Sequence, residues 1–505
     1  MRKQKIMNMK KLKIVYLLAF FCLMPLSVFA QYFNVKDYGA QGNKKLCTIA
    51  IQKAIDAAAK AGGGRVIVPA GEYLSGPLFL RSNIVFEVCS GATIYFHDDI
   101  ADTPVIMGSW EGIERKVYAS LLTGHDLENV TITGRGRIDG QGKAWWDAYW
   151  ETDKIRTEKG IREREPENPE GSPLEFPRPR MINLYRCTNV QISDISITNS
   201  PAWTIHPVYC RNVNIQGVSI IQPYESPNTD GINPESCNGV RISNCYVDCG
   251  DDCVTIKSGY NEHGRKVGIP CENITIMNCT FAHGRSAVGI GSEMSGGVRN
   301  VTVMNCVFKG TLRGLRVKTG RGRGGIVENL LANGIVMENL REGISIDMGY
   351  EGTTDKVFPV TEETPFFKNI RYSNITGCNI EQAINIVGLQ EAPPQDILLE
   401  NIRLECKQGL VANHVERLTL RNVELLSSDG KSPFSITNGA RLVLDNLSSG
   451  QLSKEYPMLD LKMTSGTVLK DCIVTFPNKG WFMQLTDCEG TEYLNNLLHD
   501  ALITK

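Results

Sequence analysis

Three aspartates on neighbouring segments are the residues of this chain best suited to chemistry. Asp230 lies two residues after Asn228 at a predicted turn, and Asp251 and Asp252 follow twenty-one residues later. Carboxyl groups crowded within a few ångströms disfavour one another's charge, so at least one keeps its proton while another ionises. A protonated carboxyl beside an ionised one can hydrolyse a glycosidic bond by acid–base catalysis.

A histidine, a basic run and a tyrosine follow the aspartates. The further candidate residues are His283, Arg316, Lys318 and Tyr350. The steps from Asp230 to Asp251, His283, Arg316 and Tyr350 are 21, 32, 33 and 34 residues. Guanidinium and ammonium groups bind carboxylates well, so basic residues beside acids favour an anionic substrate such as a carboxylated sugar.

Each of these features alone also has a structural explanation. Asn-x-Asp and Gly-Asp-Asp are common in turns, and the latter can bind calcium. A single histidine is more often a hydrogen-bonded structural residue, and a basic run can be a solvated face. Only a fold that brings these segments side by side would favour the catalytic interpretation.

A repeat along the chain indicates such a fold. Asparagine followed by an aliphatic residue opens short segments of alternating apolar and polar residues, for example at 129–132, 189–192, 212–215, 273–276 and 300–303. A recurrence every twenty to thirty-five residues, without crossover helices, predicts an all-β solenoid: a single parallel β-helix of about three strands per coil. A β-sandwich would need hairpin turns and two distinct halves, which the sequence does not indicate.

Stacking of the coils would align the candidate residues. Neighbouring coils of a β-helix lie about 4.8 Å apart, the spacing of paired strands. One polar group per coil therefore forms a ladder on one face, and five coils give a strip of roughly 20 Å. This length suits a few sugar units.

The solenoid needs covered ends, and one long segment interrupts it. We expect an amphipathic helix over 48–61 to form a helical cap within an amino-terminal region at 31–80, and the repeat to end near 450 with a carboxy-terminal cap at 450–505. The interruption at 143–180 begins with three tryptophans. They either hold this insertion against the solenoid or stack on sugars, and they are Trp145, Trp146 and Trp150.

The first thirty residues are typical of a secretory signal peptide. A basic head precedes an apolar stretch that ends in Val28-Phe29-Ala30. A membrane anchor is the alternative, but seventeen residues interrupted by Pro25 are short for a span. We therefore expect a mature chain 31–505 without a membrane span, exported to the periplasm or out of the cell.

Composition excludes several other classes. Hydrophobic residues make up 42% and charged residues 22%, which excludes wholesale disorder and a multi-span membrane protein. The net charge of −1 does not favour a nucleic-acid partner. Sixteen cysteines become an odd fifteen after cleavage, they lack zinc spacing, and their recurrence in the repeat favours a buried stack over a large disulfide set.

The motif set resembles glycoside hydrolase family 28, the polygalacturonases. The resemblance rests on Asn228-Thr229-Asp230, Gly250-Asp251-Asp252, His283-Gly284 and Arg316-Val317-Lys318, in the family's order. It extends to Tyr38-Gly39-Ala40, to the stretch 134–140 and to Pro207-Val208-Tyr209-Cys210. Two departures are small: alanine replaces a glycine at Ala282, and valine replaces isoleucine at Val317.

The resemblance implies a right-handed parallel β-helix that hydrolyses α-linked galacturonic acid with inversion and needs no metal or other cofactor. It implies that Asp251 is the general acid and that Asp230 and Asp252 hold and activate the water. It further implies supporting roles for four groups: His283 beside the acid, Arg316 and Lys318 on the sugar carboxylate, Asn228 in ordering the site, and Tyr350 on the substrate.

The mode of attack and two other enzyme types stay open. The stretch 291–298 resembles the exo-acting branch of the family, and the insertion at 143–180 could close one end of the groove. We therefore expect exo attack on pectin or pectic oligosaccharides. The alternatives are a hydrolase of rhamnogalacturonan or other branched pectin, a calcium-dependent pectate lyase, and a glycan-binding β-helix without catalysis.

Overall fold

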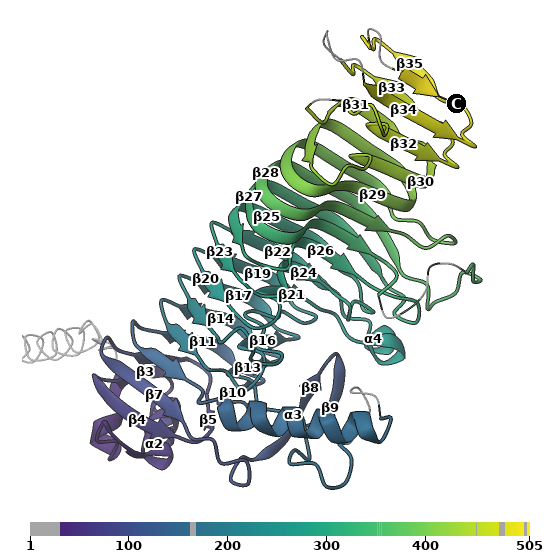
Figure 1. Cartoon of the computed structure of the whole chain (residues 1–505). Helices are drawn as coiled ribbons and strands as arrows, with labels where there is room; N and C mark the ends of the chain where they lie inside the picture. Colours follow the sequence, from purple (N-terminus) through teal and green to yellow (C-terminus); the bar gives the residue numbers. More distant parts are fainter. Residues whose placement is uncertain are drawn as a thin grey trace, which may run out of the picture.

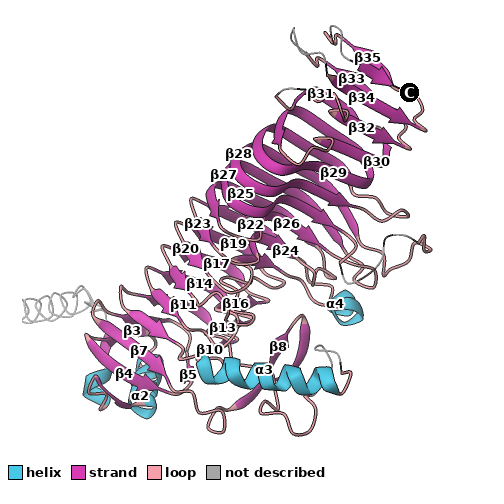
Figure 2. Ribbon diagram, viewed as in Figure 1, coloured by secondary structure: helices cyan, strands magenta, loops and turns pink. Residues whose placement is uncertain are grey.

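The chain winds into a right-handed parallel β-helix, which confirms the predicted fold class. The structure is a computed structural model that describes residues 31–161, 168–350, 352, 354, 356–450, 452–473, 480–498 and 502–504. The predicted signal peptide at 1–30 lies outside the described residues. Figure 1 shows the coils stacked from the purple amino-terminal end to the yellow carboxy-terminal end, and Figure 2 shows that strands dominate the solenoid.

Strands of successive coils form three parallel rows. The first row begins with β1 (Tyr32–Asn34), β3 (Gly64–Val68), β6 (Ile84–Val88), β11 (Glu128–Thr133), β14 (Thr188–Ser193), β17 (Arg211–Gln216), β19 (Asn238–Ser243) and β22 (Cys271–Met277). The second row contains β2 (Asn43–Leu46), β4 (Gly71–Ser75), β7 (Ala92–Phe96), β12 (Arg137–Asp139), β15 (Ser196–Thr198), β18 (Ser219–Ile221), β20 (Tyr246–Asp248) and β23 (Thr280–Ala282).

The third row carries most of the predicted site. It contains β5 (Leu78–Phe79), β10 (Leu122–His125), β13 (Ile182–Tyr185), β16 (Ile205–Val208), β21 (Val254–Ile256), β24 (Ser286–Ile290) and β26 (Arg313–Lys318). Later strands run through the corners and join more than one row, and they are β25 (Val298–Lys309), β27 (Ile326–Asp347), β28 (Phe366–Val387) and β29 (Gln395–Ser427).

Asparagines turn the chain at one corner of the coils. Asn129, Asn189 and Asn212 have positive φ angles of 56°, 57° and 54°, a region that asparagine tolerates better than most residues. The side-chain amide of Asn189 donates to Asn129 at 3.0 Å, and that of Asn212 donates to Asn189 at 2.8 Å. The corner asparagines thus form a hydrogen-bonded ladder that holds the coils in register.

The interior is a stack of apolar side chains. Val130, Val190 and Val213 occupy equivalent inward positions of neighbouring coils and are buried. A cysteine stack continues the pattern at Cys187, Cys210, Cys237 and Cys271. All fifteen cysteines among the described residues are free, as the predicted stack requires.

The two ends of the solenoid differ. Helix α2 (Thr48–Lys60) follows the short helix η1 (Val35–Tyr38) and buries its apolar face at the amino-terminal end. The prediction that the repeat ends near residue 450 is wrong. Parallel pairing continues through β30 (Phe434–Ala440), β31 (Val443–Ser448), β32 (Leu459–Lys462), β33 (Val468–Lys470), β34 (Trp481–Thr486), β35 (Glu492–Leu494) and β36 (Leu502–Thr504).

Three elements lie outside the coils. The antiparallel hairpin of β8 (Val105–Trp110) and β9 (Ile113–Tyr118) lies beside helix α3 (Lys143–Glu158), and the short helix α4 (Asn261–Val267) projects further along the solenoid. The sequence does not indicate this hairpin. No helix among the described residues has both the length and the apolar character to cross a membrane.

Candidate active site

The register of the third row places the predicted residues on successive coils. Ile232 pairs with Val254, Val254 with Val288, Val288 with Leu315, and Leu315 with Ile344. Inward residues alternate with outward ones along each strand. The outward side chains of five neighbouring coils therefore gather on one face.

A cavity of about 1130 Å³ lies on this face. This volume slightly exceeds the range of roughly 300–1,000 Å³ that is usual for small-molecule sites. The predicted residues that line it are Asn228, Asp230, Asp251, Asp252, Arg316, Lys318 and Tyr350. A short oligosaccharide therefore fits the cavity better than a single small metabolite.

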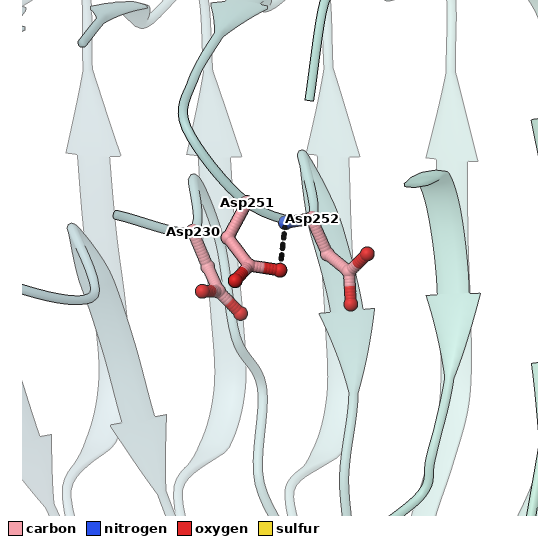
Figure 3. Close-up of side chains that lie close together, drawn as sticks. All are labelled: Asp230, Asp251 and Asp252. Atoms are coloured by element: carbon pink, nitrogen blue, oxygen red, sulfur yellow. Dashed lines mark hydrogen bonds between the residues drawn. The ribbon is translucent and has the colours of Figure 1, made fainter. Parts of the chain in front are cut away.

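The three aspartates form its centre. One carboxyl oxygen from each of Asp230, Asp251 and Asp252 lies within 4.8 Å of the others. Figure 3 shows the carboxyl groups of Asp230 and Asp251 close together, with that of Asp252 to one side. The backbone N–H of Asp252 donates to Asp251 Oδ1 at 3.0 Å, and Asn233 donates to Asp230 Oδ2 at 2.8 Å.

The surroundings shift the three pKa values in opposite directions. Burial, followed by the charge of Asp251, raises the pKa of Asp230 well above its usual value. Burial, followed by the charge of Asp252, also raises the pKa of Asp251. Burial would raise the pKa of Asp252 as well, but the positive charges of Lys318 and Arg316 outweigh it and lower that pKa. The trio thus combines two carboxyl groups whose pKa is raised, which favours the protonated form, with one whose pKa is lowered, which favours the ionised form.

The basic residues lie directly beside the carboxylates. Lys318 Nζ is 3.0 Å from Asp252 Oδ2, whereas Asp252 Oδ1 is buried without a hydrogen bond to a described residue. Arg316 Nε is also buried and unpartnered among the described residues. The ring of Tyr350 lies 5.5 Å from the Arg316 guanidinium and 5.6 Å from Lys318 Nζ. A buried polar atom without a partner is costly, so both unpartnered atoms are suited to a ligand or water.

Two predicted residues have different environments. Asn228 has a φ of 51° and its Oδ1 accepts a 2.5 Å hydrogen bond from the buried Arg178, which fixes the turn before Asp230. His283 does not line the cavity that the described residues form. Its Nδ1 lies 3.0 Å from Asp248 Oδ1, and its side chain is 58% exposed.

Two functional candidates escaped the sequence motifs. Lys257 is buried, with its Nζ 4.0 Å from Asp230 and 3.7 Å from Glu293. Arg285 Nε lies 3.5 Å from Asp251 Oδ2. Strand alternation was the available signal for Lys257, because Val254 and Ile256 of β21 point inward and Lys257 therefore points out.

The insertion contributes in two ways. Trp145 is buried and packs edge-on against Tyr118 at 5.3 Å, and Trp146 donates to the carbonyl of Ser200 at 3.0 Å. Trp145 thus holds α3 against the hairpin strand β9, and Trp146 holds it against the solenoid. Trp150, on the same helix, is half exposed and lines the cavity.

The hairpin covers the sheet at one end of the cavity. Trp110 stacks on Trp203 with ring centroids 4.9 Å apart, and Ser109 donates to the buried Glu235 at 3.1 Å. At the hairpin tip, the carbonyl of Gly112 accepts a hydrogen bond from the backbone N–H of Tyr260 at 3.2 Å. The hairpin therefore packs on the third row at the amino-terminal side of the cavity.

The carboxylate trio has the residue types of a cation site, but its neighbours do not favour one. Lys318 already lies at hydrogen-bond distance from Asp252, and Lys257 lies between Asp230 and Glu293. These ammonium groups supply the positive charge that a divalent cation would bring. The residues therefore fit acid–base chemistry better than metal binding.

Comparisons with known proteins agree with this geometry. The model of the glycosyl hydrolases family 28 matches residues 60–420. A probable polygalacturonase of Vitis vinifera is 34% identical over 382 residues, which cover 74% of each chain. The exopolygalacturonase structure from Thermotoga maritima has a TM-score of 0.70 and 34% identity, and covers 79% of this chain and 92% of that one. The family 28 exopolygalacturonase of Yersinia enterocolitica shares the fold, with a TM-score of 0.68, 24% identity and coverage of 84% and 80%.

Proposed function

Because the chain belongs to the glycosyl hydrolases family 28, we propose that it cleaves the bonds between α-linked galacturonic acid units of pectin or pectic oligosaccharides, with inversion. The observation that carries this proposal is the carboxyl trio. One buried cluster holds two carboxyl groups with raised pKa values and one with a lowered pKa, beside basic groups that suit an anionic sugar.

The three aspartates have different roles in hydrolysis. Asp251 donates its proton to the glycosidic oxygen as the bond to the anomeric carbon breaks. Asp252, the carboxylate with the lowered pKa, takes a proton from the attacking water through its unpartnered Oδ1, and Asp230 orients that water. The water oxygen joins the anomeric carbon, and the leaving sugar departs with a hydroxyl group. Because Asp251 loses one proton and Asp252 gains one, the net charge of the site does not change.

The basic residues beside the aspartates recognise the substrate. Arg316 and Lys318 bind the sugar carboxylate, and the Tyr350 ring beside both cations packs against the sugar. Ordering of the Asn228 turn by Arg178 keeps Asp230 in place. His283 supports the acid from the neighbouring loop, where its backbone carbonyl lies 3.3 Å from the sulfur of Cys253.

Inversion is the part of the proposal that product stereochemistry tests. Two-carboxylate inverting enzymes keep their carboxyl groups about 6.5–9.5 Å apart, and retaining enzymes about 5–5.5 Å. The trio is more compact than the inverting range, with oxygens within 4.8 Å. Inversion therefore rests on the family, and on two carboxylates being available to hold one water. Nuclear magnetic resonance of the first product in the reaction should detect the β anomer.

Exo attack and export complete the proposal. The packing of the hairpin at the amino-terminal side of the cavity and the position of Trp150 in its lining support removal of units from a chain end, as does the likeness to the Thermotoga maritima exopolygalacturonase. The signal-peptide features of residues 1–30 support export, where pectic polysaccharide is accessible.

The decisive experiment measures release of reducing ends from polygalacturonate. Asp251→Asn should lower kcat by about 10²–10⁴, the usual contribution of general acid catalysis, with little change in KM. Asp194→Asn, at an exposed turn, is the matched control and should keep wild-type activity. A chelator should have no effect, and ultraviolet absorption should not rise. Equal activity of Asp251→Asn and wild type would refute the proposal, and a chelator-sensitive rise in absorption would indicate a lyase.

A further inference from the structure

An arginine that no motif marks stands beside the proposed acid. Arg285 lies in the turn before β24, lines the cavity, and places its Nε 3.5 Å from Asp251 Oδ2. Its side chain is 62% exposed, whereas the side chain of Asp251 is 14% exposed. The Arg285 side chain is therefore accessible from the solvent, whereas the side chain of the acid beside it is largely covered.

The backbone fixes this pairing. The N–H of Arg285 donates to the carbonyl of Asp251 at 2.8 Å, so the two residues are joined through main chain as well as side chain. Gly284 makes the approach possible: it has a φ of 90°, and a Cβ there would lie 2.5 Å from the Asp251 carbonyl oxygen. Position 285 is thus held against the acid by the winding of the coil.

An arginine at this place poses a chemical problem. A general acid must carry a proton, yet a guanidinium beside a carboxyl favours its ionised form. The resolution lies in the substrate. The unit that departs in the reaction is next to the acid, and in galacturonate it carries a carboxylate that can compete for the exposed guanidinium.

We propose that Arg285 is a substrate-sensing residue: it pairs with Asp251 in the empty site and turns to the carboxylate of the leaving sugar when substrate binds. The inference rests on the proposed function. Asp251 is then protonated in the complex that reacts, and only a leaving unit with a free carboxylate triggers the exchange. Arg285 acts as a positioning and specificity residue, distinct from Arg316 and Lys318.

Several charged groups act on Asp251 together with Arg285. Asp230 faces it from the preceding coil and Asp252 from its own turn. Lys257, directly after β21, and Lys318 on β26 favour its ionised form, while burial and Asp252 oppose it. Among the positive charges, Arg285 acts most strongly on the pKa of Asp251, so its removal should be visible against this background.

The test compares pH profiles on digalacturonate, whose leaving unit is always the reducing-end sugar. The profile of kcat/KM reports the free enzyme, and that of kcat reports the complex. In wild type, the alkaline limb of kcat should lie above that of kcat/KM by about one pH unit. In Arg285→Gln the alkaline limb of kcat/KM should shift to higher pH until it coincides with that of kcat, because the acid then keeps its proton to higher pH. KM should increase about tenfold.

A modified substrate and two further variants complete the design. Digalacturonate methyl-esterified on the reducing-end unit should abolish the KM difference between wild type and Arg285→Gln. Arg285→Lys should restore the separation of the two limbs. Arg299→Gln, which removes an arginine paired with Glu272 outside the cavity, should behave as wild type.

Two results would overturn the inference. One is a pair of limbs in Arg285→Gln that stay apart as in wild type, and the other is an equal KM increase on the esterified and free substrates. Failure of wild type to hydrolyse either dimer or polymer is a different result, which would remove the proposed function and this inference with it.

Discussion

At the scale of single residues, Lys318 controls the proposed base. Its Nζ lies 3.0 Å from Asp252, and its charge lowers the pKa of that buried carboxyl against the effect of burial. A base must be ionised to accept a proton from water. The ion pair therefore keeps Asp252 competent at acidic pH, where an isolated buried carboxyl would be protonated.

Removal of this charge should move the acidic limb of activity. In Lys318→Met the pKa of Asp252 rises, so we expect the acidic limb of kcat/KM to shift upward by about one pH unit or more. KM should also increase, because Lys318 is proposed to bind the sugar carboxylate. Lys318→Arg keeps the charge and should keep the limb near its wild-type position. An acidic limb that does not move in Lys318→Met would show that Lys318 does not control the base.

Residue types and short spacings predict part of this site. Asp251 and Asp252 are adjacent in sequence, so their proximity needs no fold, and Asp230 joins them once coils are stacked. Arg285 could not be identified in this way because its significance depends on the direction of a side chain toward the preceding coil. The contact of His283 with Asp248 likewise depends on the fold, since it joins neighbouring coils of the second row, where β20 pairs with β23.

At the scale of elements, the corner asparagines combine two stabilising effects. Asn300 has a φ of 58°, its amide donates to Asn273 at 3.0 Å, and it accepts from Asn329 at 3.0 Å. A left-handed backbone costs roughly 1–2 kcal/mol for a residue with an ordinary side chain and little for glycine. Each net hydrogen bond contributes about 1 kcal/mol.

These contributions predict an order of stability. Asn300→Gly loses both ladder hydrogen bonds but keeps the backbone conformation, whereas Asn300→Ala loses the bonds and adds backbone strain. We expect the free energy of unfolding to fall by about 1–2 kcal/mol for glycine and by roughly 1 kcal/mol more for alanine. Urea unfolding followed by circular dichroism measures both. Equal losses for the two variants would show that backbone strain at the corner is negligible.

Elements were predictable where the repeat was regular. The Asn-aliphatic segments identified first-row strands because inward positions must be apolar and corners need left-handed angles. The hairpin was missed because its two-residue turn, Glu111-Gly112, lacks the Asn-Gly pair that usually marks such a turn. Glu111 nevertheless has a φ of 50° and Gly112 one of 76°, as a tight hairpin turn requires.

At the scale of the whole molecule, the solenoid supplies the stacked coils, and the hairpin outside them packs over one end of the cavity. Beyond residue 450 the sequence lacks a clear repeat, yet the strands that the structure describes there still pair with their neighbours. Backbone N–H and C=O groups of the preceding coil make this pairing. The same stacking would give an open groove along the third row if no other element covered it.

The position of the hairpin therefore bears on whether chain ends or internal segments of a polymer bind in the cavity. The hairpin packs over Glu235 and Trp203 at the amino-terminal end of the cavity, which supports the proposal that only chain ends enter. At equal mass below saturation, halving the mean length of polygalacturonate should roughly double the initial rate of reducing-end release, because the number of ends doubles while the number of bonds barely changes. Monomer should be the first product on chromatography, and solution viscosity should fall slowly relative to bond cleavage. A rate independent of chain length, with a spread of product sizes, would mean that the hairpin leaves room for an internal segment of the polymer.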